Sequence, residues 1–457
     1  MLSSSNRIYK NLAFVVFICF CLYNLSAQSK LGTPRLMQGP MLGAAHPTSI
    51  YVWGRVSGPF PVQIEYSETK DFKNVKKSDI INAEKSKHYI VKFNFTNLKA
   101  GTQYYYRVLV NGKLEKYLKD EFPFQFKTAP LSKANSNFSI AFGSCVRFLS
   151  DREQPIWNAV YKEQPNLFFW LGDNIYGDAL DPDILREEYL RQRDVGTLQS
   201  VIRNIPNLAI WDDHDFGLND HNKTNPIKKE ALAVFKQIWA NPDYGEDDNA
   251  GVYFKYSYSD VDFFFIDGRY HRDPNTDADS VEKSLLGKRQ YKWLTKGLAE
   301  SKATFKLIVS GSGWASAKGI GSDSWSSFVT ERNRLFEFIT HNKIGGVVLL
   351  SGDTHVGELN AIPWSKNGGY DFYDLISSPL AQSTGSNWMK GRREIRIRPV
   401  YFNGPNFGRI TFHLDTKSPY LEFTLINPRN EIVMKPLRLY AKELQNGVST
   451  WRKKQQK

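Results

Sequence analysis

The segment Asp212–Asp215 places three carboxylates and one imidazole directly after a short apolar run that ends at Trp211. Such a run, starting behind Pro206, is typical of a buried strand. Ionisable side chains crowded at the end of a buried strand need a counter-charge, because burial and mutual repulsion both disfavour their ionisation. A bound cation supplies one, since carboxylates bind hard metals and imidazole binds transition metals. A solvated acidic turn, continued by Gly217 and Asn219-Asp220, is the alternative.

Four further apolar runs end in side chains of the same kind. Ligands of open α/β sheets gather outside the carboxyl ends of the strands, so these side chains are predicted to converge on one metal site. The runs and the residues after them are Phe138–Phe142 with Gly143-Ser144-Cys145, Leu167–Leu171 with Gly172-Asp173-Asn174-Ile175-Tyr176, Phe263–Ile266 with Asp267-Gly268-Arg269, and Val347–Leu350 with Ser351-Gly352-Asp353-Thr354-His355.

Helical patterns lie between these runs. Asp181-Pro182-Asp183 combines a cap residue with proline at the first helical position and predicts a helix that continues to Arg193. Further helices are expected over 227–240, 284–301 and 330–342, and further strands over 307–310, 409–414 and 420–426. This alternation predicts an α/β domain over residues 137–440. The charged tail 441–457 is expected to be disordered at its end, from Trp451 onward.

Residues 32–130 show short alternating strands without an acid and histidine cluster. The turn Leu98–Thr102 feeds the aromatic strand Gln103–Val108, and a tyrosine at such a corner resembles fibronectin type III and immunoglobulin-like sandwiches. We expect an all-β domain that positions or shields its neighbour. A polar linker at 128–135 separates it from the α/β domain.

Residues 1–27 have the pattern of an export signal. Arg7 and Lys10 precede the apolar run Leu12–Leu25, and Leu25-Ser26-Ala27 offers a cleavage site. The run is short for a membrane span, which needs about 20 apolar residues. We therefore expect a periplasmic or extracellular protein without a stable membrane anchor; an uncleaved anchor is the alternative. Cys145 is then the one cysteine of the mature chain, and its thiol should be buried, metal-bound or catalytic.

The composition fits this division. With 457 residues, of which 41% are hydrophobic and 14% aromatic, the chain can bury a large core and form two domains. Its formal charge of +13 favours anionic partners such as phosphate esters, or simply keeps the protein soluble. No motif predicts a specific nucleic acid, and the sequence does not indicate the oligomeric state.

Taken in order, Gly-Asp-x-x-Tyr at 172–176, Trp-Asp-Asp-His-Asp at 211–215 with Asn219-Asp220, and Ser-Gly-Asp-x-His at 351–355 resemble the alkaline phosphatase D family. That family belongs to the calcineurin-like metallophosphoesterases and is distantly related to the purple acid phosphatases. The resemblance spans nearly the whole chain, because the family also carries an N-terminal fibronectin-like domain. It implies an αββα metallophosphoesterase sandwich and a phosphoric ester hydrolase.

The resemblance also implies roles for individual residues and an iron(III) centre with calcium partners. Asp173 matches a carboxylate that bridges metals, Tyr176 the phenolate of the purple acid phosphatases, and Cys145 a thiolate iron ligand. Asp353 and His355 match the ligands on the last strand, and Asp213 the carboxylate of the second metal. The resemblance implies Asp212 or Asn219 as a further oxygen donor. Three alternatives stay open: Cys145 is an inert buried thiol, Tyr176 only packs, or Asp212 orients His214.

The expected mechanism is attack by a hydroxide that two or more cations activate. His214 would protonate the leaving alkoxide, and Arg269 would hold the phosphate bidentately, unless it pairs with Asp267 instead. The substrates would be small phosphate esters or phosphate-bearing polymers, most readily monoesters, with phosphodiesterase or phospholipase activity as the alternative. Two rival hypotheses are an enzyme with Cys145 as nucleophile and a binding protein without catalysis.

Overall fold

A computed structural model describes residues 32–132, 134, 136–315, 319–385 and 395–455. The predicted export signal lies outside the described residues. Within them, no helix has the length and apolarity that crossing a membrane requires.

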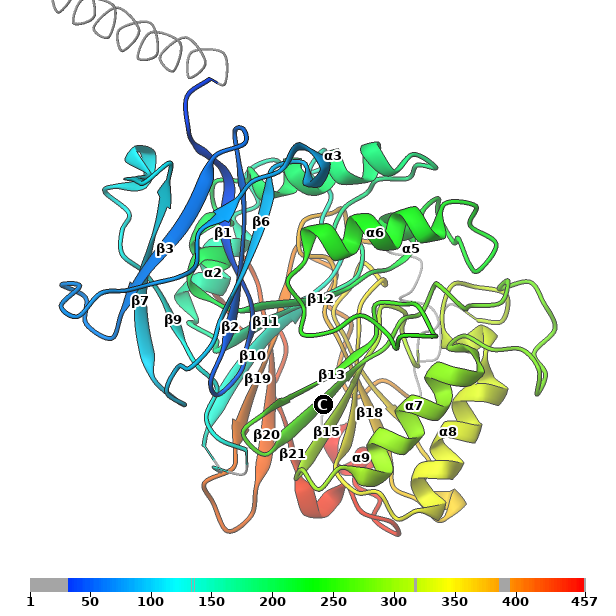
Figure 1. The fold of residues 1–457 in the computed structure, drawn as a ribbon. Helices are drawn as coiled ribbons and strands as arrows, with labels where there is room; N and C mark the ends of the chain where they lie inside the picture. Colours follow the sequence, from blue (N-terminus) through cyan, green and yellow to red (C-terminus); the bar gives the residue numbers. More distant parts are fainter. Residues whose placement is uncertain (1–31, 133, 135, 316–318, 386–394, 456–457) are drawn as a thin grey trace, which may run out of the picture.

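Two six-stranded sheets form the centre of the molecule, with strand orders β12-β11-β10-β19-β20-β21 and β13-β14-β15-β16-β18-β17 (Figure 1). The first sheet consists of β10 (Phe138–Gly143), β11 (Leu167–Leu171), β12 (Asn207–Ile210), β19 (Phe407–His413), β20 (Tyr420–Ile426) and β21 (Leu437–Tyr440). The second consists of β13 (Phe254–Tyr258), β14 (Val261–Phe265), β15 (Phe305–Val309), β16 (Val347–Ser351), β17 (Glu358–Ile362) and β18 (Phe372–Ile376).

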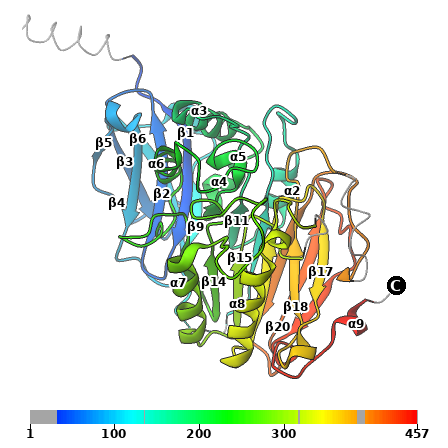
Figure 2. The same cartoon turned by 90° about the vertical axis from the view of Figure 1, so that its right-hand side faces the viewer.

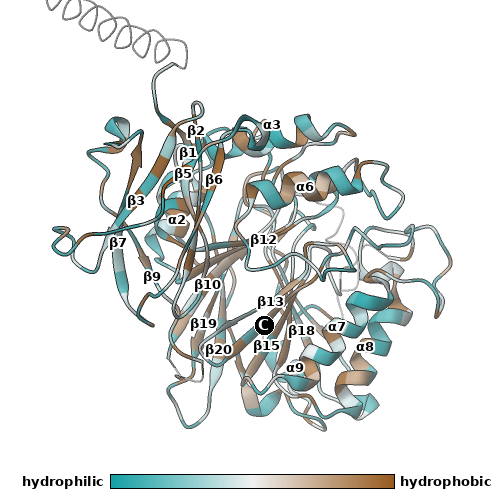
Figure 3. Ribbon diagram, in the orientation of Figure 1, coloured by the Kyte–Doolittle hydropathy of each residue, from teal (hydrophilic) through white to brown (hydrophobic). Residues whose placement is uncertain are grey.

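The two sheets pack against each other through aromatic side chains. The ring of Phe169 in β11 lies 5.0 Å from that of Phe263 and 4.9 Å from that of Phe265, both in β14. Phe412 in β19 adds a contact with Phe263 at 6.1 Å. All five residues of β11 are buried, as expected for parallel strands that are covered on both faces. Figure 3 shows these strands as the hydrophobic interior.

Helices cover the outer face of each sheet. In the first layer, Trp157 of α2 packs on Trp170 of β11 with ring centroids 4.8 Å apart. In the second, Phe336 of α8 stacks on Phe372 of β18 at 4.1 Å, and Figure 2 shows α7 and α8 in front of their sheet. The predicted αββα sandwich is therefore confirmed. The helices are α2 (Ile156–Lys162), α3 (Pro182–Arg193), α4 (Gln199–Asn204), α5 (Asp213–Phe216), α6 (Lys228–Ile238), α7 (Gly287–Glu300) and α8 (Val329–His341).

The N-terminal part is an all-β sandwich, as predicted, with its own hydrophobic core. Its tyrosine corner is present, because the Tyr104 hydroxyl accepts a hydrogen bond from the backbone N–H of Lys99 at 2.9 Å. One sheet holds β1 (Leu36–Ala45), β2 (Ile50–Val56) and β6 (Ile90–Phe95), and the other holds β3 (Pro61–Ser67), β4 (Lys76–Lys77), β5 (Ile81–Asn82), β7 (Gln103–Val110), β8 (Lys113–Leu114) and β9 (Phe124–Lys127).

The N-terminal sandwich donates hydrogen bonds to the carboxyl end of α6. The Ala44 backbone N–H donates to Ala240 O at 2.9 Å, and the Trp53 indole donates to Gln237 O at 3.0 Å. The Lys92 ammonium donates to two more carbonyls, of Lys236 and Trp239. These contacts satisfy carbonyl groups that the end of a helix leaves without partners.

The structure differs from the expected elements in two ways. Strands β13, β17, β18 and β21 and helices α2, α4 and α5 were not anticipated. The expected disorder from Trp451 onward is wrong for residues 451–454, which form helix α9, and Trp451 is buried in the core with 6% of its surface exposed; residues 456–457 lie outside the described part of the chain. The domain boundaries at 32–130, 137–440 and 441–457 stay predictions.

Candidate metal centre

Backbone hydrogen bonds join the strand ends that carry the candidate ligands. Cys145 N donates to Gly172 O at 3.3 Å, and Val146 N to Asp173 O at 2.8 Å, which ties the segment after β10 to that after β11. Asp353 N donates to Ser144 Oγ at 3.1 Å and so ties the second sheet to the first. The carboxyl edges of both sheets therefore meet at one place.

Glycines let these segments approach closely. Gly172 has φ of +92°, and a Cβ there would lie 2.6 Å from the Asp212 Cβ. A Cβ on Gly311, after β15, would lie 2.8 Å from the Asp212 carboxyl carbon. Both approaches are closer than a side chain allows, so glycine at these positions is what brings Asp212 to the centre.

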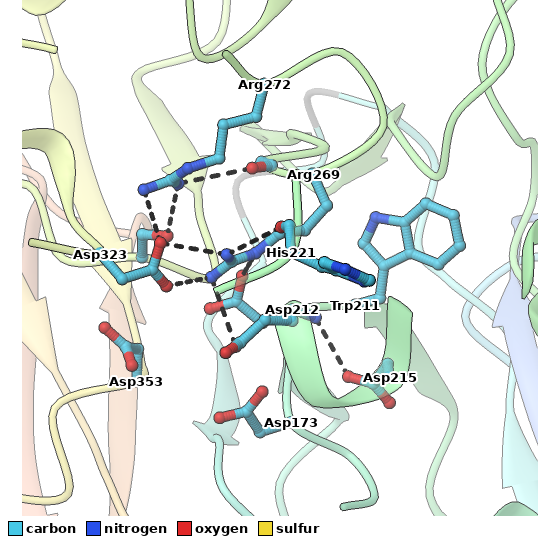
Figure 4. Close-up of polar contacts among 12 residues, drawn as sticks. Asp173, Trp211, Asp212, Asp215, His221, Arg269, Arg272, Asp323 and Asp353 are labelled. Carbon is cyan, nitrogen blue, oxygen red and sulfur yellow. Dashed lines mark hydrogen bonds and ion pairs between the residues drawn. The ribbon is translucent and has the colours of Figure 1, made fainter. Parts of the chain in front are cut away.

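The candidate ligands form three connected groups, within each of which one ligand atom per residue lies within 4.8 Å of the others. Asp173 belongs to the first two groups, and Asp213 to the last two. The groups are Cys145 with Asp173 and His355, Asp173 with Asp213 and His214, and Asp212 with Asp213 and Asp323. This connected row, part of which Figure 4 shows, is the arrangement expected of a site for more than one cation.

Four of the predicted ligands have backbones in the left-handed region, which is uncommon for residues other than glycine. The φ values are +61° at Cys145, +49° at Asp173, +68° at Asp353 and +53° at His355. Such conformations cluster at functional sites, where the surrounding structure offsets their strain. Here the hydrogen bonds between strand ends hold them.

Without a cation, the first group leaves polar atoms without compensation. Among the described residues, Asp173 Oδ1 is buried and has no hydrogen-bond partner. Burial, followed by the charges of Cys145 and Asp213, raises the pKa of Asp173 well above its usual value. The Cys145 thiol is fully buried 3.4 Å from Asp173 Oδ2, and burial followed by Asp353 raises its pKa to about 11. A metal ion would satisfy all these groups, so the residues fit one.

His214 lies in the second group, held by a carboxylate that sequence analysis missed. Its Nδ1 is 2.5 Å from Asp178 Oδ1, and its Nε2 is 4.0 Å from Asp213 Oδ2. Burial alone would lower the pKa of His214, but Asp173, Asp178 and Asp213 outweigh burial and raise it to about 10. Asp178, rather than Asp212, is thus the carboxylate that orients this imidazole.

Tyr176 connects His214 with the first group. Its hydroxyl lies 2.9 Å from His355 Nε2, and its ring lies 4.1 Å from the His214 ring. Burial, followed by Cys145 and Asp173, raises the pKa of Tyr176 well above its usual value. Tyr176 therefore presents its oxygen to the candidate ligands and does more than pack.

Arg269 is placed differently from the prediction. Its side chain is fully buried and pairs with Asp212 and Asp323 (Figure 4). Asp213 lies 3.4 Å from the same guanidinium. Arg272 adds a second ion pair with Asp323 at 2.7 Å. A guanidinium enclosed by these partners cannot also hold a substrate phosphate, so the predicted clamp is wrong. The alternative pairing with Asp267 is wrong too, because only the Arg269 backbone N–H reaches that carboxylate, at 2.8 Å.

Asp323 is the member of the third group that sequence analysis missed. It lies in the Gly- and Ser-rich segment between β15 and α8, and it is buried with 6% of its surface exposed. No strand pattern precedes it, so nothing in the sequence distinguishes it from a loop residue. Asn219, a predicted oxygen donor, is exposed on the turn after α5. Asp353 is half-buried on the Asp173 side of the centre (Figure 4).

The stacked sheets and the ligand-lined edge define the metallophosphoesterase class, and solved structures show the same fold. The "Structure of PhoD" superposes with a TM-score of 0.73 at 18% identity, covering 90% of this chain and 93% of that one. A purple acid phosphatase, PPD1 from yellow lupin (Lupinus luteus) seeds, superposes with a TM-score of 0.62 at 12% identity over 89% of this chain and 74% of that one.

Sequence comparison places the chain within this class. Residues 140–398 match the family model of the PhoD-like phosphatases, and residues 23–130 match that of the PhoD-like phosphatase N-terminal domain. The chain belongs to the PhoD-like phosphatase family, as its motifs predicted. Alkaline phosphatase D of Bacillus subtilis (strain 168) is 24% identical over 363 residues, which are 68% of this chain. The match covers 60% of that relative, less than two thirds of its length.

Proposed function

We propose that this protein is an exported, metal-dependent phosphoric ester hydrolase that acts most readily on monoesters. The observation that carries the proposal is the convergence of Cys145, Asp173, Asp213, His214 and His355 from separate strand ends into connected groups. Membership of a phosphatase family supports it. A binding protein without catalysis would not need ionisable groups held in such a buried row.

Metal ions at this site would activate water and neutralise the phosphoryl oxygens. We propose iron(III) beside Cys145, Tyr176 and His355, because thiol, phenol and imidazole donors bind transition metals rather than calcium. Calcium is proposed beside the carboxylates, where the ligands are oxygen atoms.

His214 is proposed to protonate the leaving alkoxide. Asp178 binds its Nδ1, which leaves Nε2 directed toward Asp213 and the centre. A carboxylate on Nδ1 fixes the orientation of the ring and stabilises the imidazolium form. Asp178 is therefore proposed as a positioning residue.

The proposed substrates are small phosphate esters or phosphate-bearing polymers in the periplasm or outside the cell. A monoester carries one ester substituent instead of two and has the greater negative charge. Both properties suit a cation site. Activity on diesters or phospholipids over the same centre is the competing function. An aryl monoester and a bis-aryl diester of the same phenol separate the two.

The test is metal analysis of protein purified without chelators, together with ester hydrolysis before and after chelation. We expect bound iron and calcium, loss of hydrolysis on stripping, and recovery on reloading. Asp173→Asn should lose metal from two groups at once, whereas Asn74→Ala, at an exposed residue of the N-terminal sandwich, should retain it. Activity that survives complete stripping would refute the proposal.

Thiol alkylation tests the rival in which Cys145 attacks the substrate. A nucleophilic cysteine needs a thiolate and access, but the Cys145 thiol is fully buried and its pKa is raised to about 11, first by burial. We expect the loaded protein to keep its activity in iodoacetamide. Rapid inactivation with full metal content would favour the cysteine mechanism.

A further inference from the structure

Because protein carboxylates enclose Arg269, this arginine does not bind the substrate phosphate. Both Arg269 and Arg272 are fully buried and pair with Asp323 on the inner side of the centre. A phosphoryl group carries several oxygens, and those that face away from the ligands need donors on the solvent side. A cation at the rim would meet this need.

Arg147 lies at the rim. It is exposed, and its guanidinium carbon is 5.4 Å from the centre of the Tyr176 ring. Tyr176 also contacts the first group of candidate ligands, because its hydroxyl lies 2.9 Å from His355 Nε2. The Arg147 head group is thus one aromatic ring away from the first group of candidate ligands.

The backbone of Arg147 is fixed although its side chain is exposed. Its N–H donates to Ala381 O at 2.8 Å, and the preceding Val146 N donates to Asp173 O at 2.8 Å. Arg147 therefore follows Cys145 on a segment that is bonded on one side to the β11 loop and on the other to the segment after β18. A side chain that starts from a fixed backbone and rests on a ring loses less freedom when it binds an anion.

The Arg147 charge is also available. Within the described ranges, no carboxylate forms an ion pair with it, whereas Arg186 and Arg191 on the nearby helix α3 pair with Asp183 and Glu188. An exposed arginine without a counter-charge beside a phosphatase centre is suited to bidentate recognition of phosphate oxygens.

We propose that the Arg147 guanidinium binds outward-facing oxygens of the substrate phosphoryl group and so favours monoesters over diesters. The inference deepens the proposed function and rests on it. A monoester presents three terminal oxygens and a diester two, so a donor at the rim gains more from the monoester. The same contact would hold the product, inorganic phosphate.

The test measures phosphate binding and hydrolysis separately in Arg147→Met, which keeps an unbranched side chain and removes the guanidinium and its charge. Isothermal titration of metal-loaded protein with inorganic phosphate should show a Kd raised about tenfold to a hundredfold, the range for a lost hydrogen bond to a charged group. The kcat/KM for an aryl monoester should fall by a similar factor, and that for a bis-aryl diester by less than about threefold. Arg147→Lys should lie between the wild type and Arg147→Met.

Arg152→Met is the matched control. Arg152 is exposed on the same segment and lies over the Phe148 ring, 5.9 Å from its centre, instead of over Tyr176. It should change neither the phosphate Kd nor the ratio of monoester to diester activity. An equal effect in both variants would reduce the role of Arg147 to general surface charge and overturn the proposal.

Two further results would overturn it. An unchanged phosphate Kd in Arg147→Met would show that the guanidinium does not bind the anion. A loss of metal would show that Arg147 acts through Tyr176 instead. A wild-type protein that carries metal and binds phosphate without hydrolysing esters would refute the proposed function, and the titration would still decide the role of Arg147.

Discussion

Replacement of Arg269 by methionine should destabilise the protein strongly. The change removes the cation that pairs with Asp212 and Asp323 and that lies 3.4 Å from Asp213, while all three carboxylates stay buried. Breaking a buried ion pair from one side costs about 3–5 kcal/mol, because the remaining charge is left without compensation. Against a typical total stability of about 5–15 kcal/mol, that is a large part.

The loss should depend on pH with a definite sign. Burial without the Arg269 charge would raise the pKa values of Asp212 and Asp213 in the folded variant above the unfolded value of about 3.9. Between those values the unfolded chain has released protons that the folded variant still binds, so stability falls as pH rises. Arg269→Met should therefore lose more stability relative to the wild type at pH 8 than at pH 5.

Urea unfolding at both pH values, followed by tryptophan fluorescence, measures the effect on metal-stripped protein. Arg289 pairs with Asp248 at the surface, so Arg289→Met is the matched control and should change the midpoint little. Adding Asp212→Asn to Arg269→Met should recover part of the loss, because Asp212 is the carboxylate that loses its ion pair with Arg269, whereas Asp323 keeps Arg272. A loss below about 1 kcal/mol at pH 8, or one that does not depend on pH, would refute this reasoning.

Three further predictions concern other parts of the molecule. His214→Ala should reduce hydrolysis of alkyl esters by about 100-fold or more and that of activated aryl esters much less, because aryl leaving groups need no proton; equal losses would argue against the acid role. Burial lowers the pKa of Lys92 to about 8, so the unfolded chain binds one more proton between pH 8 and 10, and stability should rise there by roughly 1–2 kcal/mol; Lys92→Met should lack this rise in unfolding midpoint. Trp451→Ala should cost about 3 kcal/mol in urea unfolding, since Trp451 is buried in the core; an unchanged midpoint would mean that the end of the chain adds nothing to stability.

Local patterns were sufficient to predict that the candidate ligands at the strand ends lie close together. Cys145, Asp173, Asp213 and His355 each follow a buried apolar run, and parallel strands bring such positions to a common edge. The αββα sandwich and the tyrosine corner followed from the same periodicities and turns.

Tertiary contacts decided what could not be predicted. The sequence shows that Arg269 is a cation near acids, but not whether its partners come from the protein or from a substrate. Asp323 and Asp178 come from irregular loops, where no periodicity fixes the direction of a side chain. Helix α9 depends on the burial of Trp451 against distant strands, and its charged composition hides this contact.

The hydrogen bonds between the N-terminal sandwich and α6 limit where this protein can be truncated. Phe235 of α6 packs on Trp211 with ring centroids 5.4 Å apart, and Trp211 directly precedes Asp212. Helix α6, whose end the sandwich contacts, therefore packs against the segment that carries Asp212. A truncated protein that starts at the linker would leave the carbonyls of Lys236, Gln237 and Ala240 without these donors, so the two modules should be expressed as one unit.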